Sequence, residues 1–296
     1  MRRSTKEILI KRAFLATAVT SLAVLALIMI FLFMEGLPTF SFVSVKDFLF
    51  GFDWYPTDEA NPAYGILPLI AASGSVTALS SLLAIPLGVM TAVYLAEIAS
   101  PRVRAVVKPV VEMLASLPSV VIGFFGMVVM APFLQDFFDI PIGLNLSNAA
   151  LMLAFMSVPT IASVSEDAIY AVPRDLKEAS FALGATHLET LLRVTLPAAL
   201  SGIGTAVILG MSRAIGETMV VLMVAGGAAV IPKSLWSPVR PMPASIAAEM
   251  AEAPFRGHHY HALFATAMVL FLVTLLFNIL ADYFSHKHQQ SGAASL

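Results

Sequence analysis

The sequence has no cysteine and few charged residues. Of its 296 residues only 12% are Asp, Glu, Lys or Arg, whereas a soluble domain usually has about a quarter. The absence of cysteine excludes a disulfide framework and any thiolate-based metal or redox chemistry. Hydrophobic residues make up 58% of the chain, and its mean hydropathy is +0.87. This composition predicts an integral membrane protein.

The motifs of common enzyme sites are also missing. The sequence has no GxxxxGK(S/T) phosphate-binding loop, no HExxH zinc motif and no GxSxG nucleophile elbow. Basic residues do not alternate with aromatic residues, so no nucleic-acid partner is expected. His258, His259 and His261 have no Asp, Glu or Cys at ligand spacing beside them. We therefore predict no metal site and no cofactor bound by this chain.

Six apolar segments are long enough to cross a bilayer, because a hydrocarbon core of about 30 Å needs about 20 helical residues. Backbone groups in lipid must be satisfied within a segment, which favours helices, and the apolar runs do not alternate as barrel strands would. An all-α fold with six transmembrane helices is expected. The segments are approximately 13–34, 69–95, 105–134, 148–165, 199–225 and 262–284.

The first segment could instead be a signal peptide, since five basic residues precede it. Its apolar length of about 20 residues exceeds the usual 7–15 of a signal core, and no small-residue cleavage site follows. We therefore expect a retained helix.

Lysine and arginine orient the chain, because cytoplasmic loops are enriched in both. With residues 1–12 in the cytoplasm, 12 of the 17 Lys and Arg fall inside, four fall outside, and Arg213 lies within a span. Both termini are thus expected to be cytoplasmic. The remaining divisions are a periplasmic loop at 35–68 with a short helix near 44–50, a five-helix core at 69–284, an outer loop at 226–261 with a short helix near 243–251, and a disordered tail at 285–296.

The fifth segment contains a charge deep in the bilayer. Arg213 lies about 21 Å along from residue 199, at about 1.5 Å per residue, and a central Arg is costly there. Glu217 follows four residues later, which places it on the same face of a helix and able to neutralise Arg213. The pair is either a structural link or part of a substrate pathway, and we favour the pathway.

Proline and small residues interrupt two neighbouring spans. Pro86 and Gly88 lie in the second segment, and Pro118 and Ser119 lie in the third. Proline removes a backbone hydrogen bond and kinks a helix. Simple packing kinks are the alternative, but two adjacent interrupted spans favour a pathway, as in transporters with broken helices.

A charged stretch separates the fourth and fifth spans. It reads PRDLKEASFALGATHLETLLRVTLP over 173–197, a composition that cannot span a bilayer. The pattern predicts two short helices hinged at Gly184, on the cytoplasmic side, which present small residues to a partner.

The spacing within this stretch resembles the EAA loop of ABC-importer permeases. That pattern is EAA, three residues, G, nine residues, I, one residue, LP. The chain departs from it with Ser180 in place of the third Ala and Val194 in place of Ile. In that family the loop docks on a separate ATPase subunit. The positions that match, or replace, the pattern's coupling residues are Glu178, Ala179, Ser180, Gly184, Leu196 and Pro197.

Other blocks resemble permeases of the phosphate-specific transport system, PstC type. They are YGILP at 64–68, AIPLG at 84–88, SLPSVVIGFFG at 116–126, RAIGET at 213–218 and, within a long first outer loop, FDWYP at 52–56. Residues 71–73 read Ala-Ala-Ser, where the family usually has an aromatic residue and Gly-Thr.

The resemblance implies a multi-pass permease of the bacterial inner membrane that imports phosphate by alternating access. It also implies three partners: a PstA-type permease, a PstB-type ATPase dimer that holds ATP and Mg, and a PstS-type periplasmic phosphate-binding protein. The missing phosphate-binding loop is then explained, because the nucleotide site is on another chain. Pro118, Ser119, Arg213 and Glu217 are expected along the substrate pathway. A permease for molybdate or sulfate remains an alternative, as does a stand-alone channel or scaffold.

Overall fold

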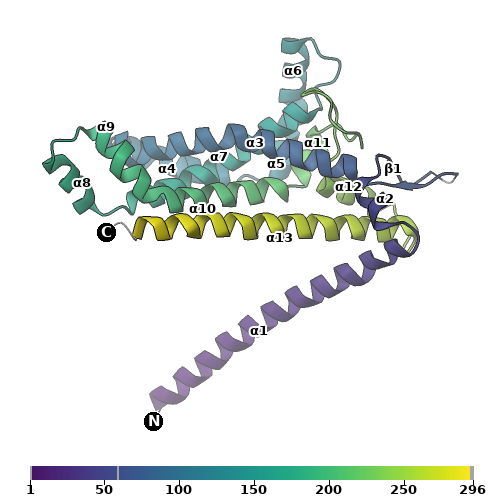
Figure 1. Cartoon of the computed structure of the whole chain (residues 1–296), viewed down its shortest axis with the longest axis horizontal. Helices are drawn as coiled ribbons and strands as arrows, with labels where there is room; N and C mark the ends of the chain where they lie inside the picture. Colours follow the sequence, from purple (N-terminus) through teal and green to yellow (C-terminus); the bar gives the residue numbers. More distant parts are fainter. Residues whose placement is uncertain (1, 59, 294–296) are drawn as a thin grey trace.

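The chain folds into a bundle of long helices in a computed structural model, which describes residues 2–58 and 60–293 (Figure 1). Among these residues, six helices are long and apolar enough to cross a membrane. The prediction of an all-α protein with six transmembrane helices is confirmed. The candidate spans are Ile10–Ser41, Leu67–Ile98, Ser119–Phe138, Leu146–Tyr170, His187–Ile215 and His258–Tyr283.

Three helices form the centre of the bundle: α3 (Leu67–Val93), α7 (Leu146–Tyr170) and α10 (Leu196–Ile215). Ile161 of α7 packs against a glycine on each of the other two helices. A Cβ atom at Gly88 of α3 would lie 2.7 Å from Ile161 Cγ2, and one at Gly210 of α10 would lie 2.5 Å from Ile161 Cγ1. Small residues therefore allow all three helices to approach closely.

The second span is not interrupted at Pro86. Helix α3 continues through this proline and ends in a π-helical turn, Tyr94–Ile98. The prediction of an interruption here is wrong, because the backbone stays helical through Pro86. Gly88 instead allows α3 to pack closely against Ile161 of α7.

The third span is broken, as the proline indicated, but its bounds differ from the expected 105–134. Helix α4 (Pro101–Ala115) ends before Ser116, and α5 (Ser119–Phe125) begins after Pro118. A π-helical turn (Gly126–Met130) and α6 (Ala131–Phe138) complete the span. α4 is thus a separate helix that starts at the N-cap residue Ser100, whose hydroxyl accepts the Val103 amide at 3.4 Å.

The fifth span starts earlier and ends sooner than the expected 199–225. α9 (His187–Thr190), a π-helical turn (Leu191–Thr195) and α10 form one continuous helix. A break at 216–218 then separates α10 from α11 (Met219–Val224). Of the two short helices predicted around Gly184, only the first, α8 (Arg174–Ala182), is short.

One end of the bundle is capped by small elements. These are α2 (Val45–Phe50), the antiparallel strands β1 (Trp54–Tyr55) and β2 (Ala63–Tyr64), and α12 (Met242–Glu249). Both predicted loop helices, near 44–50 and 243–251, are present. Ser73, at the position where the sequence departs from the family pattern, accepts the Met242 amide at 2.8 Å and joins α3 to α12.

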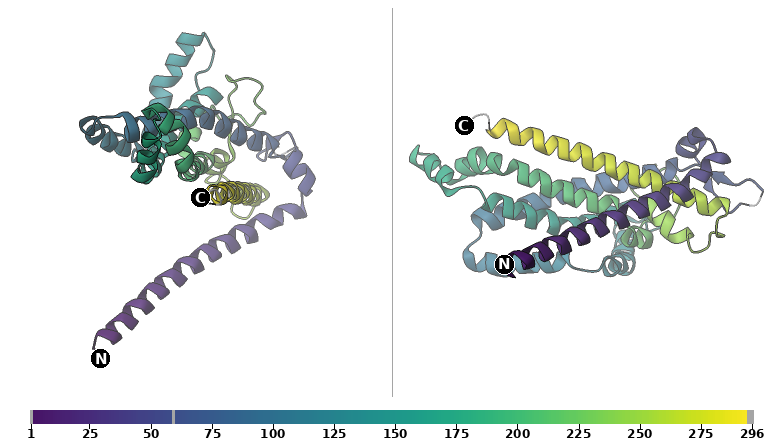
Figure 2. Two further views of the ribbon diagram at one scale, coloured as in Figure 1. Left: turned by 60° about the vertical axis from the view of Figure 1, so that its left-hand side comes forward. Right: turned by 90° about the horizontal axis from the view of Figure 1, so that it is seen from below.

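The first and last helices lie at the side of the bundle. α13 (His258–Ala293) packs along α10, whereas α1 (Arg2–Gly36) meets α13 near one end and then diverges from the bundle (Figures 1 and 2). The most apolar window of α1 is 0% buried. Helix α13 extends through residues 285–293, which were expected to be disordered. Residues 294–296 of the same predicted tail lie outside the described residues.

Candidate functional site

The 173–197 stretch forms a projection at the end of the bundle opposite β1 (Figure 1). Helix α8 ends at Ala182, and Gly184 reverses the chain with φ +87°, a left-handed conformation that suits glycine. The next helix starts with a capping box, in which Thr186 and Glu189 satisfy each other's backbone amides. The turn at Gly184 predicted from the sequence is therefore present.

The tip of this projection exposes apolar side chains. Leu183 is 90% exposed and Leu188 is 62% exposed. Glu178 and Ala179 on α8 are also exposed. Among the other residues of the pattern, Pro197 is exposed and Leu196 is half-buried at the start of α10.

Ser180, which replaces the third alanine of the pattern, points inward. Its Oγ lies 2.9 Å from Thr190 Oγ1, and both residues are buried. This hydrogen bond joins α8 to α9 across the Gly184 turn, so the hydroxyl at this position has a structural use. The substitution could be read from the sequence, but its partner could not.

Arg213 lies at the break between α4 and α5. Its Nη2 donates a hydrogen bond, at 3.5 Å, to the carbonyl of Ala115, the last residue of α4. A helix C-terminus leaves carbonyls unpaired and carries partial negative charge, so a guanidinium is favourable there. The structure thereby brings Arg213 close to the break between α4 and α5. Pro118 at the end of this break is exposed, and Ser119, the first residue of α5, is half-buried.

The prediction that Arg213 and Glu217 lie as a pair on one face of a helix is wrong. Helix α10 ends at Ile215, so Glu217 lies beyond it, and the two residues, both within the described chain, form no ion pair. Glu217 Oε1 instead accepts the backbone amides of Met219 at 3.1 Å and Val220 at 3.2 Å, at the start of α11. Gly216 ends the helix before the i+4 relationship can form.

The structure contains an ionic cluster between α4 and α7 that was not predicted from the sequence. The Glu166 carboxylate of α7 is fully buried and accepts hydrogen bonds from Arg104 and Lys108 of α4, the latter at 2.5 Å. Lys108 also pairs with Asp167 at 2.7 Å. Burial lowers the pKa of Lys108, but the hydrogen bonds to Asp167 and Glu166 and the negative charges of both together outweigh burial, so its pKa lies above the ordinary value.

At the opposite end, the Glu249 carboxylate joins several elements. It accepts hydrogen bonds from Trp54 Nε1 at 3.0 Å, Arg240 Nη1 at 2.6 Å and Ser245 Oγ at 2.8 Å, and His259 Nε2 lies at 2.9 Å. Strand β1, α12 and the start of α13 are fixed together in this way. No local pattern predicts this network, because Trp54 and Glu249 lie 195 residues apart in the sequence.

The three histidines in the first turn of α13 make structural contacts. His259 pairs with Glu249, the ring of His261 contacts the carbonyl of Glu35 at 2.8 Å, and His258 stacks on Phe42. Among the described residues, no group of three or more His, Cys, Asp or Glu is arranged to hold a metal ion.

These features define a polytopic membrane protein whose third span is preceded by a break in the helix and which has an exposed segment outside the spans. Residues 84–289 match the family described as "binding-protein-dependent transport system inner membrane component", and the chain belongs to this family. It is therefore a permease subunit of an ABC importer, a transport component of the bacterial inner membrane. The resemblance noted in the sequence is confirmed at this level.

Relatives support the more specific resemblance. The chain is 38% identical to "Probable ABC transporter permease protein YqgH" of Bacillus subtilis, over 93% of this chain and 89% of that protein. It is 34% identical to "Phosphate transport system permease protein PstC" of Pasteurella multocida, over 81% and 78%. The corresponding PstC protein of Mesorhizobium japonicum is 35% identical over 79% and 78%.

Solved structures agree on the fold. The chain is similar to a subunit of a bacterial alginate ABC transporter, with a TM-score of 0.65 and 16% identity over 96% of each chain. It is also similar to a chain of the MetNI methionine ABC transporter in an inward-facing conformation, with a TM-score of 0.56 and 21% identity over 76% of this chain and 94% of that one. Both likenesses support the architecture of a type I importer permease.

Proposed function

We propose that this chain imports inorganic phosphate by alternating access, driven by ATP hydrolysis on a separate ATPase that binds segment 178–197. The proposed assembly contains a PstA-type permease, a PstB-type ATPase dimer with ATP and Mg, and a PstS-type binding protein. The termini are assigned to the cytoplasm by the distribution of Lys and Arg.

The exposed tip of the projection is the observation that carries this proposal. Leu183 is 90% exposed at the end of a segment whose charged residues keep it out of lipid, and exposed apolar surface of this kind typically marks a protein contact. The positions Glu178 and Ala179, which match the docking pattern, are exposed beside it.

Motion of the docked segment has a direct route to the pathway. α9 and α10 form one continuous helix from His187 to Ile215, and Arg213 lies in its last turn. When ATP closes the ATPase dimer, a displacement at His187 is carried along this helix to the break between α4 and α5. Both the ATPase and the substrate then bias one two-state element, as coupling requires.

Phosphate is the substrate that the residues and the relatives favour. A guanidinium such as that of Arg213 can bind two phosphate oxygens at once, and relatives at 34% and 35% identity are named phosphate transport permeases. Pro118 and Ser119 line the pathway at the break in this proposal. The negative charge of Glu217, just beyond α10, keeps the dianion from being held too tightly.

Uptake of radiolabelled phosphate into proteoliposomes tests the proposal. The purified complex with its ATPase and binding protein is expected to accumulate phosphate only with ATP, and excess molybdate or sulfate is expected not to compete. Competition by either anion would assign a different oxyanion. Uptake without ATP would indicate a channel, and no uptake of any of the three anions would indicate a scaffold.

A further inference from the structure

Helix α4 is weakly held by apolar packing. No residue of α4, all of which the structure describes, is fully buried, although the helix packs alongside α7. The backbone is non-helical on both sides of it: Ala99 and Ser100 are extended before α4 begins, and the break at 116–118 follows it. A helix between two such joints can move as a rigid unit unless side chains fix it.

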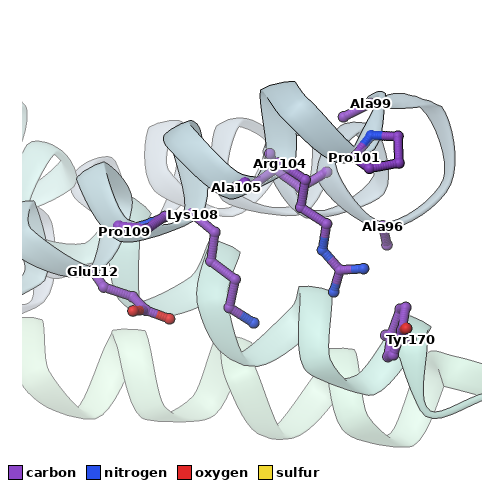
Figure 3. A pocket seen from close by; sticks show the side chains of 10 residues that line it. Ala96, Ala99, Pro101, Arg104, Ala105, Lys108, Pro109, Glu112 and Tyr170 are labelled. Carbon is purple, nitrogen blue, oxygen red and sulfur yellow. The ribbon is translucent and has the colours of Figure 1, made fainter.

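The ionic cluster with Glu166 supplies this fixation. Both cations, Arg104 and Lys108, come from α4, and both carboxylates, Glu166 and Asp167, come from α7. Figure 3 shows the two basic side chains extending from α4 toward α7, with the guanidinium of Arg104 near Tyr170. Its Cζ lies 4.2 Å from the centre of the Tyr170 ring, which adds a cation–π contact.

The burial of Glu166 makes its ion pairs important for the attachment of α4. Its side chain has 0% exposure, and removing the cations from a buried carboxylate is strongly unfavourable. A cavity of about 530 Å³ borders the cluster, lined among others by Leu95, Arg104, Glu112 and Tyr170. α4 therefore has open space on this side, and charge, not close packing, determines its position.

The two ends of α4 face the two functional regions. Near its start it is joined to α7, whose C-terminal end leads through residues 171–173 into α8 of the docking segment. At its end, the carbonyl of Ala115 accepts the hydrogen bond from Arg213. A change in the position of α4 thus changes what Arg213 contacts.

We propose that Glu166 is a positioning residue for transport. By holding Arg104 and Lys108, it makes α4 move with α7. The position of segment 178–197 then determines whether Arg213 donates its hydrogen bond to the Ala115 carbonyl or is free to bind the anion. This inference rests on the proposed function, because it assigns a further residue to the same coupling pathway.

The test combines transport with a distance measurement. The chain has no cysteine, so cysteines at Val106 of α4 and Phe155 of α7, both exposed, can carry spin labels in the reconstituted complex. With Glu166 intact, we expect a single narrow distance distribution that is unchanged by ATP. With Glu166→Gln, we expect a broadened distribution, at least a tenfold loss of phosphate transported per ATP, and continued ATP hydrolysis.

A matched control distinguishes this role from general stability. Glu112→Gln removes an exposed carboxylate of α4, one turn after Lys108, and is expected to leave both measurements unchanged. Lys108→Arg keeps the charge and is expected to transport normally. If the complex with Glu166→Gln does not assemble, Lys108→Gln, which leaves Arg104 on Glu166, is measured with the same criteria.

A narrow, unchanged distance distribution in the Glu166→Gln complex would overturn the proposal, as would normal transport per ATP. The distance measurement does not depend on the substrate. Failure of the proposed function, seen as no phosphate uptake by the unmodified complex, is therefore distinguishable from failure of this inference.

Discussion

Lys177 of α8 forms an ion pair with Glu97 at the end of the second span, with 2.5 Å between Lys177 Nζ and Glu97 Oε1. Their side chains are only 21% and 10% exposed. α8 is linked to the bundle by the chain at Pro173 and by the hydrogen bond of Ser180. The ion pair therefore helps to fix the angle at which α8 projects from the bundle.

Lys177→Met is expected to loosen this projection, because it keeps an unbranched apolar stem but leaves the Glu97 carboxylate without its ion-pair partner. The cost should fall between that of an exposed pair and that of a fully buried pair, at about 1–3 kcal/mol. The unfolding temperature of the purified complex and the phosphate transported per ATP would both decrease. Asp175→Asn, an exposed change on the same helix, is the control, and equal losses in both variants would contradict the prediction.

The hydroxyl pair of Ser180 and Thr190 predicts a non-additive mutant cycle. Ser180→Ala leaves the buried Thr190 hydroxyl without its partner and should destabilise the complex by about 1 kcal/mol. Combining Ser180→Ala with Thr190→Val removes both polar groups and should recover most of that loss. Chemical or thermal unfolding of the wild-type complex, the two single variants and the double variant measures the cycle. Additive losses would show that the hydrogen bond does not link α8 to α9.

Arg213→Ala is expected to abolish phosphate uptake while the complex still assembles and hydrolyses ATP. The hydrogen bond of Arg213 to the Ala115 carbonyl is at the limit of hydrogen-bond length, so the loss of this bond should cost little stability. Arg213→Lys retains charge without bidentate geometry and should transport at a reduced rate. Arg102→Ala, an exposed change on α4, serves as the control in the same vesicles. Uptake near the wild-type level with Arg213→Ala would remove Arg213 from the pathway.

The left-handed turn at Gly184 predicts a conformational requirement for coupling. Proline fixes φ near −65° and cannot adopt the observed +87°, so Gly184→Pro should dissociate the ATPase or uncouple hydrolysis from uptake. Gly184→Asn is the matched control, because Asn tolerates this region and a Cβ here meets no atom within 4 Å. Co-purification of a coupled complex carrying Gly184→Pro would refute the requirement.

An exposed charge on α8 provides an independent test of docking. Glu178 is exposed, so Glu178→Lys should weaken ATPase binding without lowering the unfolding temperature. Co-purification of the ATPase with the permease measures the first effect, and thermal unfolding of the permease measures the second. A fully coupled complex with this charge reversal would contradict a docking role for this face of α8.

Local patterns in the sequence were sufficient to predict the spans and the turn at Gly184, but not the contacts between distant residues. Apolar length predicted all six candidate spans, and spacing predicted the turn at Gly184. The i+4 pairing of Arg213 and Glu217 failed because α10 ends at Ile215, which hydropathy alone does not reveal. The partners of Glu166 lie 58 and 62 residues away, and only the packing of α4 on α7 brings them together.

Glycine packing in the centre of the bundle gives a prediction that does not depend on transport. Gly210→Ala would place a methyl group 2.5 Å from Ile161 Cγ1, and such overpacking typically costs about 1–3 kcal/mol. Gly204→Ala on the same helix meets no atom within 4 Å and should be neutral or slightly stabilising, because alanine favours a helix over glycine by about 1 kcal/mol. Thermal unfolding compares the two variants. Adding Ile161→Val, which removes one methyl group from the facing side chain, should restore part of the stability lost with Gly210→Ala, and equal unfolding temperatures for the two alanine variants would show that α7 and α10 can separate without cost.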